Sequence, residues 1–114
     1  MTHPNLTRLA EWRVDYEIRQ SKCIIQDRLG EEVVVFAYPY GKHNRSVKET
    51  AQKHFRGACS TKLGRVDSGS DVYLLNRVDM YYLSRPGLFR RLSRNDLAAY
   101  LKIRQALRNL KQYF

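Results

Sequence analysis

The sequence predicts an α/β fold with mostly parallel strands, and two observations support this prediction. Residues 33–38 begin with three consecutive valines and an aromatic residue, which is typical of a strand buried on both faces, as in parallel sheets. A helical pattern follows at residues 46–54, and a short apolar stretch comes next at residues 57–61. A strand, a helix and a second strand in this order predict a right-handed βαβ unit.

The loop after the first strand is a candidate wall of a binding site. Pro39 cannot donate a ladder hydrogen bond, so the strand is expected to end there, and Gly41 permits a tight exit. In open α/β sheets, ligands bind outside the carboxyl ends of the strands. We therefore expect residues 38–41, including Tyr38, Pro39 and Gly41, to line any site that the protein has.

Two helices are expected to pack on the sheet. The first spans about residues 10–29, where apolar residues recur at helical spacing, and Gly30 is placed to end it. Ser46 followed by Glu49 forms a capping-box pattern, which predicts that the second helix begins at Ser46. The residues predicted to face the sheet are Val14, Ile18, Ile25 and Leu29 in the first helix and Val47, Ala51 and Phe55 in the second.

The remainder of the chain predicts a loop, a strand and a helix. Residues 62–71 are rich in Gly, Ser and Asp, and residues 72–80 form a third strand candidate. Ser93 with Asp96 three residues later predicts the start of a last helix, which would run to about Gln112. Its expected apolar stripe consists of Tyr100, Ile103, Leu107, Leu110 and Phe114.

Composition restricts the class of protein. With 114 residues the chain forms one domain at most, and no apolar run approaches the roughly 20 residues that span a bilayer. The first residues do not resemble a signal peptide, so the default expectation for the chain as given is the cytoplasm. Cys23 and Cys59 lack a paired spacing and are interpreted as buried small hydrophobic residues.

Positive charge is concentrated at the C-terminal end of the chain. The formal net charge is +10, and residues 85–114 contain eight basic residues and one acidic residue. Such a basic helix could bind an anionic partner. The simpler interpretation, which we favour at this point, is a solvated basic face on a helix that packs through its apolar stripe.

Several short motifs in order resemble the second half of a polysaccharide deacetylase. They are Phe-Ala-Tyr-Pro-Tyr-Gly at residues 36–41, Phe-Arg-Gly-Ala-Cys-Ser-Thr at 55–61 and Leu-Asn-Arg-Val-Asp at 75–79. Residues 2–6, Thr-His-Pro-Asn-Leu, are similar to the end of the family's His-Thr-x-x-His-Pro metal motif. The resemblance spans about residues 2–83 and is to the chitooligosaccharide deacetylase-like group, carbohydrate esterase family 4.

The resemblance implies a fold and an activity. The family has a distorted (β/α) barrel, of which this chain would form a partial barrel with mostly parallel strands, flanking helices and a C-terminal basic amphipathic helix. Its members hydrolyse N-acetyl groups on amino-sugar polymers or oligosaccharides. An Asp and two His hold a divalent metal, usually zinc, and a second Asp acts as general base.

Two residues match the family's site positions, and a third position departs from them. His3 matches the second metal histidine, and Tyr40 matches the residue whose backbone N–H faces the oxyanion. Ala37 stands where many members have an arginine that orients the catalytic base. We hypothesise that Arg77, at the end of the third strand, orients the same carboxylate.

The departures from the family pattern bear on activity. The motif's first histidine would precede residue 1, and the Asp-Asp motif has no counterpart in the sequence. Since catalytic zinc needs about three protein ligands, we expect this chain alone to hold no metal and to be inactive. Residues 1–84 would be the C-terminal part of a deacetylase-like domain, and residues 85–114 a basic helical extension packing on it. The alternatives are a non-catalytic basic interaction module built on a deacetylase remnant, or a homodimer paired through exposed sheet edges.

Overall fold

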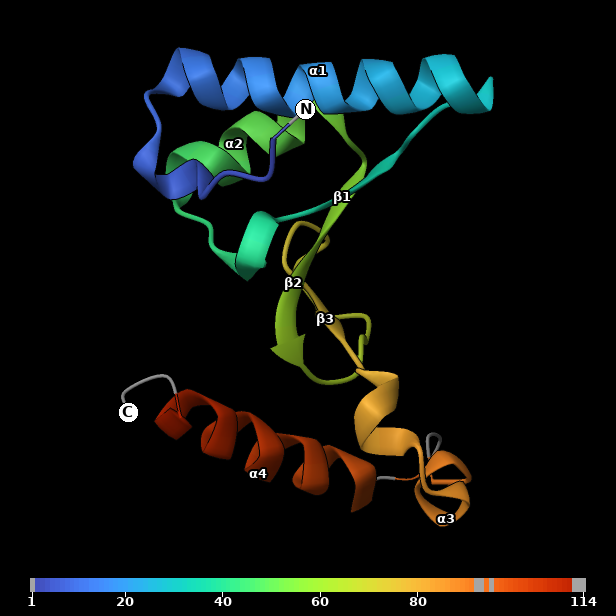
Figure 1. Ribbon diagram of the computed structural model, residues 1–114. Coiled ribbons are helices and arrows are strands. Elements are labelled where there is room, and N and C mark those ends of the chain that lie inside the picture. The colour runs from blue at the N-terminus through green and yellow to red at the C-terminus, as the bar shows by residue number, and fades with distance from the viewer. Residues whose placement is uncertain (1, 92–93, 95, 112–114) are drawn as a thin grey trace. The chain divides into compact units, whose positions relative to one another are not determined.

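The computed structural model describes residues 2–91, 94 and 96–111, and the described residues form a mixed α/β structure (Figure 1). The chain divides into two compact units, each described by itself: unit 1 is Met1–Thr61 with Gly69–Leu75, and unit 2 is Lys62–Ser68 with Asn76–Phe114. The division at residues 84 and 85 that the resemblance implies stays a prediction. In order, the elements are η1 (Leu6–Arg8), α1 (Glu11–Leu29), β1 (Val35–Ala37), η2 (Pro39–Gly41), α2 (Arg45–His54), β2 (Gly57–Leu63), β3 (Leu75–Arg77), η3 (Met80–Leu83), α3 (Pro86–Phe89) and α4 (Asp96–Lys111), where η marks a 3-10 helix.

The three strands form one sheet in the order β1-β2-β3. β1 pairs with β2 in parallel, with Val35 opposite Gly57 and Ala37 opposite Cys59, and α2 connects the two strands. The parallel strand–helix–strand unit predicted from the sequence is therefore confirmed. The strands differ in length from the prediction, because β2 extends through Leu63 and β3 contains three residues only.

β1 is not buried on both faces, which corrects the prediction from its valines. Alternate side chains of a strand point to opposite faces. Phe36 packs against the core of unit 1, whereas Val35 is 51% exposed. Within the described sheet β1 is also an edge strand, so one side of it has no paired strand. Pairing of two copies through sheet edges stays a prediction.

The core of unit 1 lies between α1, α2 and the sheet. Val14 and Ile18 of α1 and Val47 and Ala51 of α2 are buried, as predicted from their spacing. Gly30 ends α1 in the left-handed conformation, also as predicted. α2 lies beside the N-terminal part of α1 (Figure 1), and the later apolar residues of α1 are more exposed than expected. Ile25 is 37% exposed and Leu29 66%, while Trp12 and Tyr16 lie on the outer surface of the helix.

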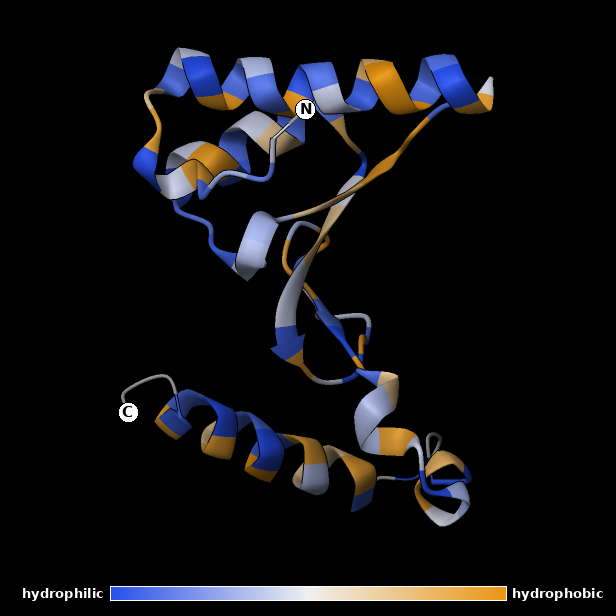
Figure 2. Ribbon diagram, viewed as in Figure 1, coloured by the Kyte–Doolittle hydropathy of each residue, from blue (hydrophilic) through white to orange (hydrophobic). Residues whose placement is uncertain are grey.

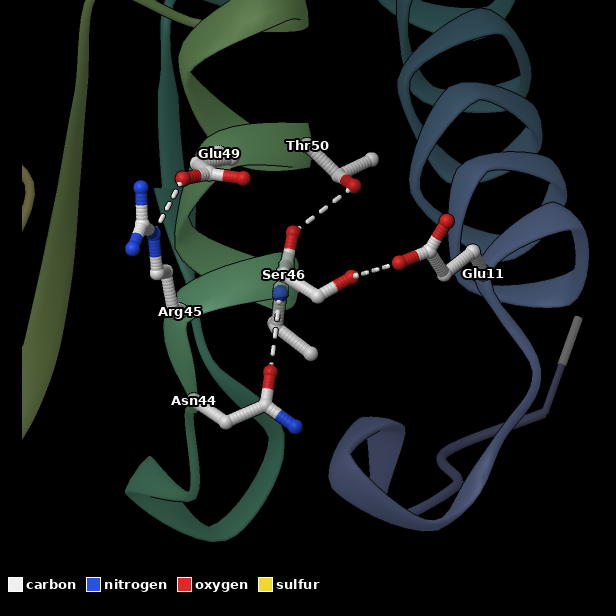
Figure 3. Close-up of polar contacts among 7 residues, drawn as sticks. Glu11, Asn44, Arg45, Ser46, Glu49 and Thr50 are labelled. Atoms are coloured by element: carbon white, nitrogen blue, oxygen red, sulfur yellow. Dashed lines mark hydrogen bonds and ion pairs between the residues drawn. The ribbon is translucent and has the colours of Figure 1, made fainter.

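Asn44, rather than Ser46, caps the N-terminus of α2. The Asn44 Oδ1 atom accepts a hydrogen bond of 2.9 Å from the Val47 N–H (Figure 3). The predicted capping box is wrong because Ser46 already lies inside the helix, where its hydroxyl donates to Glu11 Oε1 at 3.4 Å. Glu49 instead forms an ion pair with Arg45 one turn earlier (Figure 3).

Unit 2 has a small core of its own. Leu83 of η3 and Leu97 and Leu101 of α4 are buried together, with Tyr100 packed against them. The expectation that α4 packs through its predicted apolar stripe is otherwise wrong among the described residues, because Ile103, Leu107 and Leu110 are exposed. Ser93, Gln112 and Phe114, which the sequence assigned to this helix, lie outside the described residues.

The two cysteines are less buried than the sequence predicted. Cys23 is exposed and Cys59 half-buried, and both are free thiols, so neither is the buried hydrophobic residue that was expected.

Among residues 2–91, 94 and 96–111, no helix combines the length and the apolar content needed to cross a membrane.

Substituting the α2 cap should separate the two cap candidates. We expect Asn44→Ala to lower the free energy of unfolding by about 1 kcal/mol, because the Val47 N–H loses its acceptor. Ser46→Ala should cost about half as much or less, since its exposed contact with Glu11 is long. Urea unfolding followed by circular dichroism measures both variants. Equal losses, or a larger loss for Ser46→Ala, would contradict the assignment.

Candidate functional site

The candidate site is the turn that follows β1. The Tyr38 N–H makes the last hydrogen bond to β2, at 3.3 Å from the Cys59 carbonyl oxygen. Pro39 has no N–H, so pairing stops, and η2 begins. Tyr40 and Gly41 then both adopt positive φ, at 59° and 67°. A tyrosine in the left-handed region is strained, and such residues gather at functional sites.

Gly41 is required by close packing as well as by its φ. A Cβ atom at Gly41 would lie 2.7 Å from Thr61 Cγ2 and 2.8 Å from Thr61 Cβ. Both distances are below 3.0 Å, which real Cβ atoms essentially never show, and the atoms belong to a short β-branched side chain with little freedom. The turn can therefore pass beside β2 only where residue 41 has no side chain.

Tyr38 fixes the turn from the interior of unit 1. Its side chain is buried, and its hydroxyl donates a hydrogen bond of 2.9 Å to the Tyr73 carbonyl oxygen. The Tyr73 hydroxyl in turn donates to the Phe55 carbonyl oxygen at 2.8 Å. Burial, followed by the charges of Asp71 and Tyr73, raises the pKa of Tyr38 to about 12. Tyr38 thus stays protonated and serves as a donor over the whole neutral range.

His3 and the turn meet in unit 1. The His3 and Tyr40 rings contact edge to face, with centroids 4.9 Å apart, and the Tyr40 side chain is exposed. His3 and Pro39 also line a pocket of about 220 Å³, whose other walls combine apolar residues of β1 with polar, charged and apolar residues of α1. Ile18 and Phe36 belong to these walls. Residues far apart in the sequence, which the resemblance assigns to one site, are therefore neighbours in space.

Arg77 belongs to the other compact unit. It ends β3, its side chain is exposed, and its carbonyl oxygen accepts a hydrogen bond of 3.2 Å from the Gly64 N–H. Its predicted role toward a catalytic base, like the roles of His3 and Tyr40, stays a prediction.

The described residues do not fit a divalent metal. Nowhere in residues 2–91, 94 and 96–111 do three His, Cys, Asp or Glu side chains gather as metal ligands must. His43 contacts the Gly41 carbonyl oxygen at 3.1 Å, and His54 bonds to Asp15 Oδ1 at 2.7 Å. His3 and His43 both contact the turn, through the Tyr40 ring and the Gly41 carbonyl oxygen, but among the described residues they do not form a set of three metal ligands. We derive no step through a metal.

Sequence reasoning missed the residues that support the turn from outside its motif. Lys48 of α2 pairs with Asp71, and the Asp71 carboxylate also accepts the Tyr73 N–H at 2.9 Å. The Lys48 hydrogen bond, followed by that N–H, lowers the pKa of Asp71. The composition of residues 62–71 predicts a loop, and nothing local in the sequence signals that Asp71 contacts α2.

The chain resembles the polysaccharide deacetylases in sequence. Residues 1–56 match the polysaccharide deacetylase family model. No curated protein matches the chain.

Solved deacetylase structures resemble the chain over 68% of its length. BC0361, a polysaccharide deacetylase from Bacillus cereus, is 25% identical with a TM-score of 0.62, and the match covers 25% of that chain. BA0330, a putative polysaccharide deacetylase from Bacillus anthracis, gives the same values. The Streptococcus pyogenes deacetylase PplD, solved in complex with acetate, is similar in fold, with 23% identity, a TM-score of 0.65 and 35% of its chain covered.

These matches confirm the resemblance to the polysaccharide deacetylases that the motifs indicated. The chain spans about a quarter to a third of the length of these solved relatives. The α/β fold with its parallel strand pair agrees with theirs, whereas a closed barrel is not seen among the described residues.

Two glycines with similar φ allow a matched test of the turn. Gly30→Ala should cost about 1 kcal/mol, because φ is +70° but no atom lies within 4 Å of the added Cβ. Gly41→Ala should cost at least about 2 kcal/mol more, because the Thr61 side chain occupies the space. Chemical unfolding of both variants provides the comparison. Similar losses at the two positions would show that the approach to Thr61 is not required.

The Tyr38 hydroxyl should make stability depend on alkaline pH. Its pKa in the folded state, about 12, exceeds the ordinary value near 10, so the folded state binds the proton more tightly. The stabilisation is complete below about pH 10 and is lost as pH rises toward about 12. Tyr38→Phe should flatten this dependence in urea unfolding at about pH 9 and about pH 11, whereas Tyr81→Phe, at a residue 79% exposed, should leave it unchanged. An unaltered slope in Tyr38→Phe would refute the assignment.

Proposed function

We propose that this chain supplies one side of the active site of a metal-dependent N-deacetylase that acts on amino-sugar polymers or oligosaccharides. The observation that carries the proposal is the contact between the His3 and Tyr40 rings, 4.9 Å apart. Both residues lie within the segment that matches the polysaccharide deacetylase family model. The motif similarity at residues 2–6 and 36–41 supports a place for both of them in the proposed reaction centre.

Tyr40 is proposed to act through its backbone. Hydrolysis of an N-acetyl group passes through a tetrahedral intermediate with a negatively charged oxygen, which preorganised N–H donors stabilise. Tyr40 lies in the turn directly after β1, and Gly41, which packs against Thr61, and Tyr38, which bonds to the Tyr73 carbonyl oxygen, fix the backbone on both sides of it. This fixed position of the Tyr40 backbone supports its proposed role as the oxyanion donor.

His3 is proposed as one ligand of the metal. The described residues of this chain do not complete a metal site, so the further ligands, the first motif histidine and the Asp-Asp motif, would come from outside it. In that larger assembly, a (β/α) barrel, Arg77 would orient the carboxylate that serves as general base. A bound divalent ion would polarise the amide carbonyl and activate water. The chain alone is then a non-catalytic part of the enzyme.

Acetate release tests the proposal in two contexts. The purified chain, given zinc and an N-acetylated chitooligosaccharide, should release no acetate, because its described residues do not bring together the three ligands that catalytic zinc needs. The segment of this chain that matches PplD, substituted for its counterpart in PplD, should yield a hybrid that does release acetate. In the hybrid, His3→Ala should lower the rate by about 100-fold or more, whereas Trp12→Ala, at a residue 70% exposed, should leave it within about twofold.

Thermal unfolding of the hybrid accompanies the assay. A hybrid that unfolds cooperatively but releases no acetate would contradict the proposal, as would a rate indifferent to His3→Ala. Deacetylation by the purified chain alone would overturn the part of the proposal that assigns the metal ligands outside it.

A further inference from the structure

α4 has two apolar faces, of which one is exposed. Leu97 and Leu101 are buried in the core of unit 2 and anchor the helix there. A second apolar face follows the three- and four-residue helical spacing and lies outside that core. It consists of Ala99, Ile103, Ala106, Leu107 and Leu110, with Ile103 61%, Leu107 48% and Leu110 58% exposed. We call these five residues the outer stripe.

Basic residues border the outer stripe on both sides. At about 100° per residue, Lys102 lies along one edge of it, and Arg104 and Lys111 lie along the other. All three side chains are exposed. Within α4 the single acidic residue is Asp96, in the first turn, and its carboxylate is within 3.6 Å of the Arg91 guanidinium. The electrostatic potential along the remainder of the stripe is therefore positive. Figure 2 shows hydrophobic and hydrophilic positions alternating along this helix.

Two tyrosines extend the apolar surface beyond the helix. Tyr81 and Tyr82 of η3 line an open depression of about 460 Å³ together with Leu107 and Leu110. Tyr81 is 79% exposed. Arg104 forms the basic rim here, with its guanidinium 5.6 Å from the centre of the Tyr82 ring. Exposed aromatic rings of this kind prefer an environment that is apolar at one end and wet at the other.

The chemistry of this surface distinguishes among three occupants. A second copy of the chain, docked on the same face, would bring like positive charges together. A nucleic acid strand would use the tyrosines and the basic residues but leave Ile103, Leu107 and Leu110 in water. An anionic bilayer surface would contact all three kinds of side chain on this surface. The aliphatic side chains would enter the acyl boundary, the tyrosines would lie at the headgroup level, and the bordering basic side chains would contact lipid phosphates. We propose that the outer stripe of α4, with Tyr81 and Tyr82, docks the protein onto an anionic phospholipid surface.

Vesicle sedimentation with the full chain tests this proposal. The chain should bind vesicles of phosphatidylcholine containing about one third phosphatidylserine and should not bind phosphatidylcholine alone. The triple variant Ile103→Gln, Leu107→Gln, Leu110→Gln should weaken binding at least about tenfold, because it removes the inserted groups. The double variant Lys102→Gln, Lys111→Gln should weaken it about fivefold for each charge removed.

The control variant changes exposed apolar residues elsewhere. Trp12→Gln with Leu29→Gln alters α1, where the residues are 70% and 66% exposed, and should leave vesicle binding unchanged. Since all substituted residues are exposed, circular dichroism should show each variant folded.

Three results would overturn the proposal. The first is no binding to anionic vesicles. The second is binding that depends on the lysines but not on the outer stripe and that a single-stranded oligonucleotide displaces, which would assign the surface to nucleic acid. The third is concentration-dependent dimerisation that the triple variant abolishes while vesicle binding persists, which would assign the stripe to a second copy.

Discussion

The close approach of Gly41 to Thr61 is the constraint on which unit 1 depends. β1 and β2 are parallel neighbours, so the chain leaves the end of β1 right beside β2. Pro39 ends the pairing, and the positive φ of Tyr40 and Gly41 then turns the backbone within van der Waals contact of Thr61. This turn delivers the chain to Asn44, where α2 begins. The same backbone geometry that closes the βαβ unit therefore presents the Tyr40 peptide at the carboxyl end of the sheet.

Buried hydroxyl groups extend this constraint to a segment that is remote in sequence. Tyr38 binds the carbonyl oxygen of Tyr73, and Tyr73 binds that of Phe55, so the turn, α2 and residues 69–75 are joined by directed hydrogen bonds. The Ala58 N–H also donates to the Val72 carbonyl oxygen at 2.9 Å. These bonds explain why Gly69–Leu75 belongs to unit 1 although residues 62–68 belong to unit 2. Because such groups are costly to leave unpaired in the interior, they fix the position of the segment more strictly than apolar contacts would.

Local patterns predicted the features that depend on local physics. Gly30 as a helix end, the buried face at Val47 and Ala51, and the parallel strand pair each follow from spacing or backbone preference, and the structure has them. The wrong predictions concern features that depend on contacts with residues distant in the sequence. Ser46 fits a capping box as well as Asn44 fits a simple cap, and the contact of Ser46 with Glu11 of α1 is invisible to a local pattern. Val35 lies in a stretch with the composition of a buried strand, but the burial of its side chain depends on what packs against the outer face of β1.

The motif at residues 36–41 combines structural and chemical residues, which is why the motif alone could not separate them. Tyr38 is buried and bonded and Gly41 is fixed by packing, so both are needed for the turn whether or not the protein binds anything. Tyr40 differs: its side chain is 63% exposed, its φ is unfavourable for a residue with a Cβ, and its ring meets His3 from the start of the chain. Stability does not explain an exposed tyrosine in a strained conformation, since glycine would fit there at lower cost. The proposed reaction centre would give the Tyr40 ring a role beside His3, and the strained φ, the exposure and the ring contact are the structural argument for keeping His3 and Tyr40 together as the candidate site.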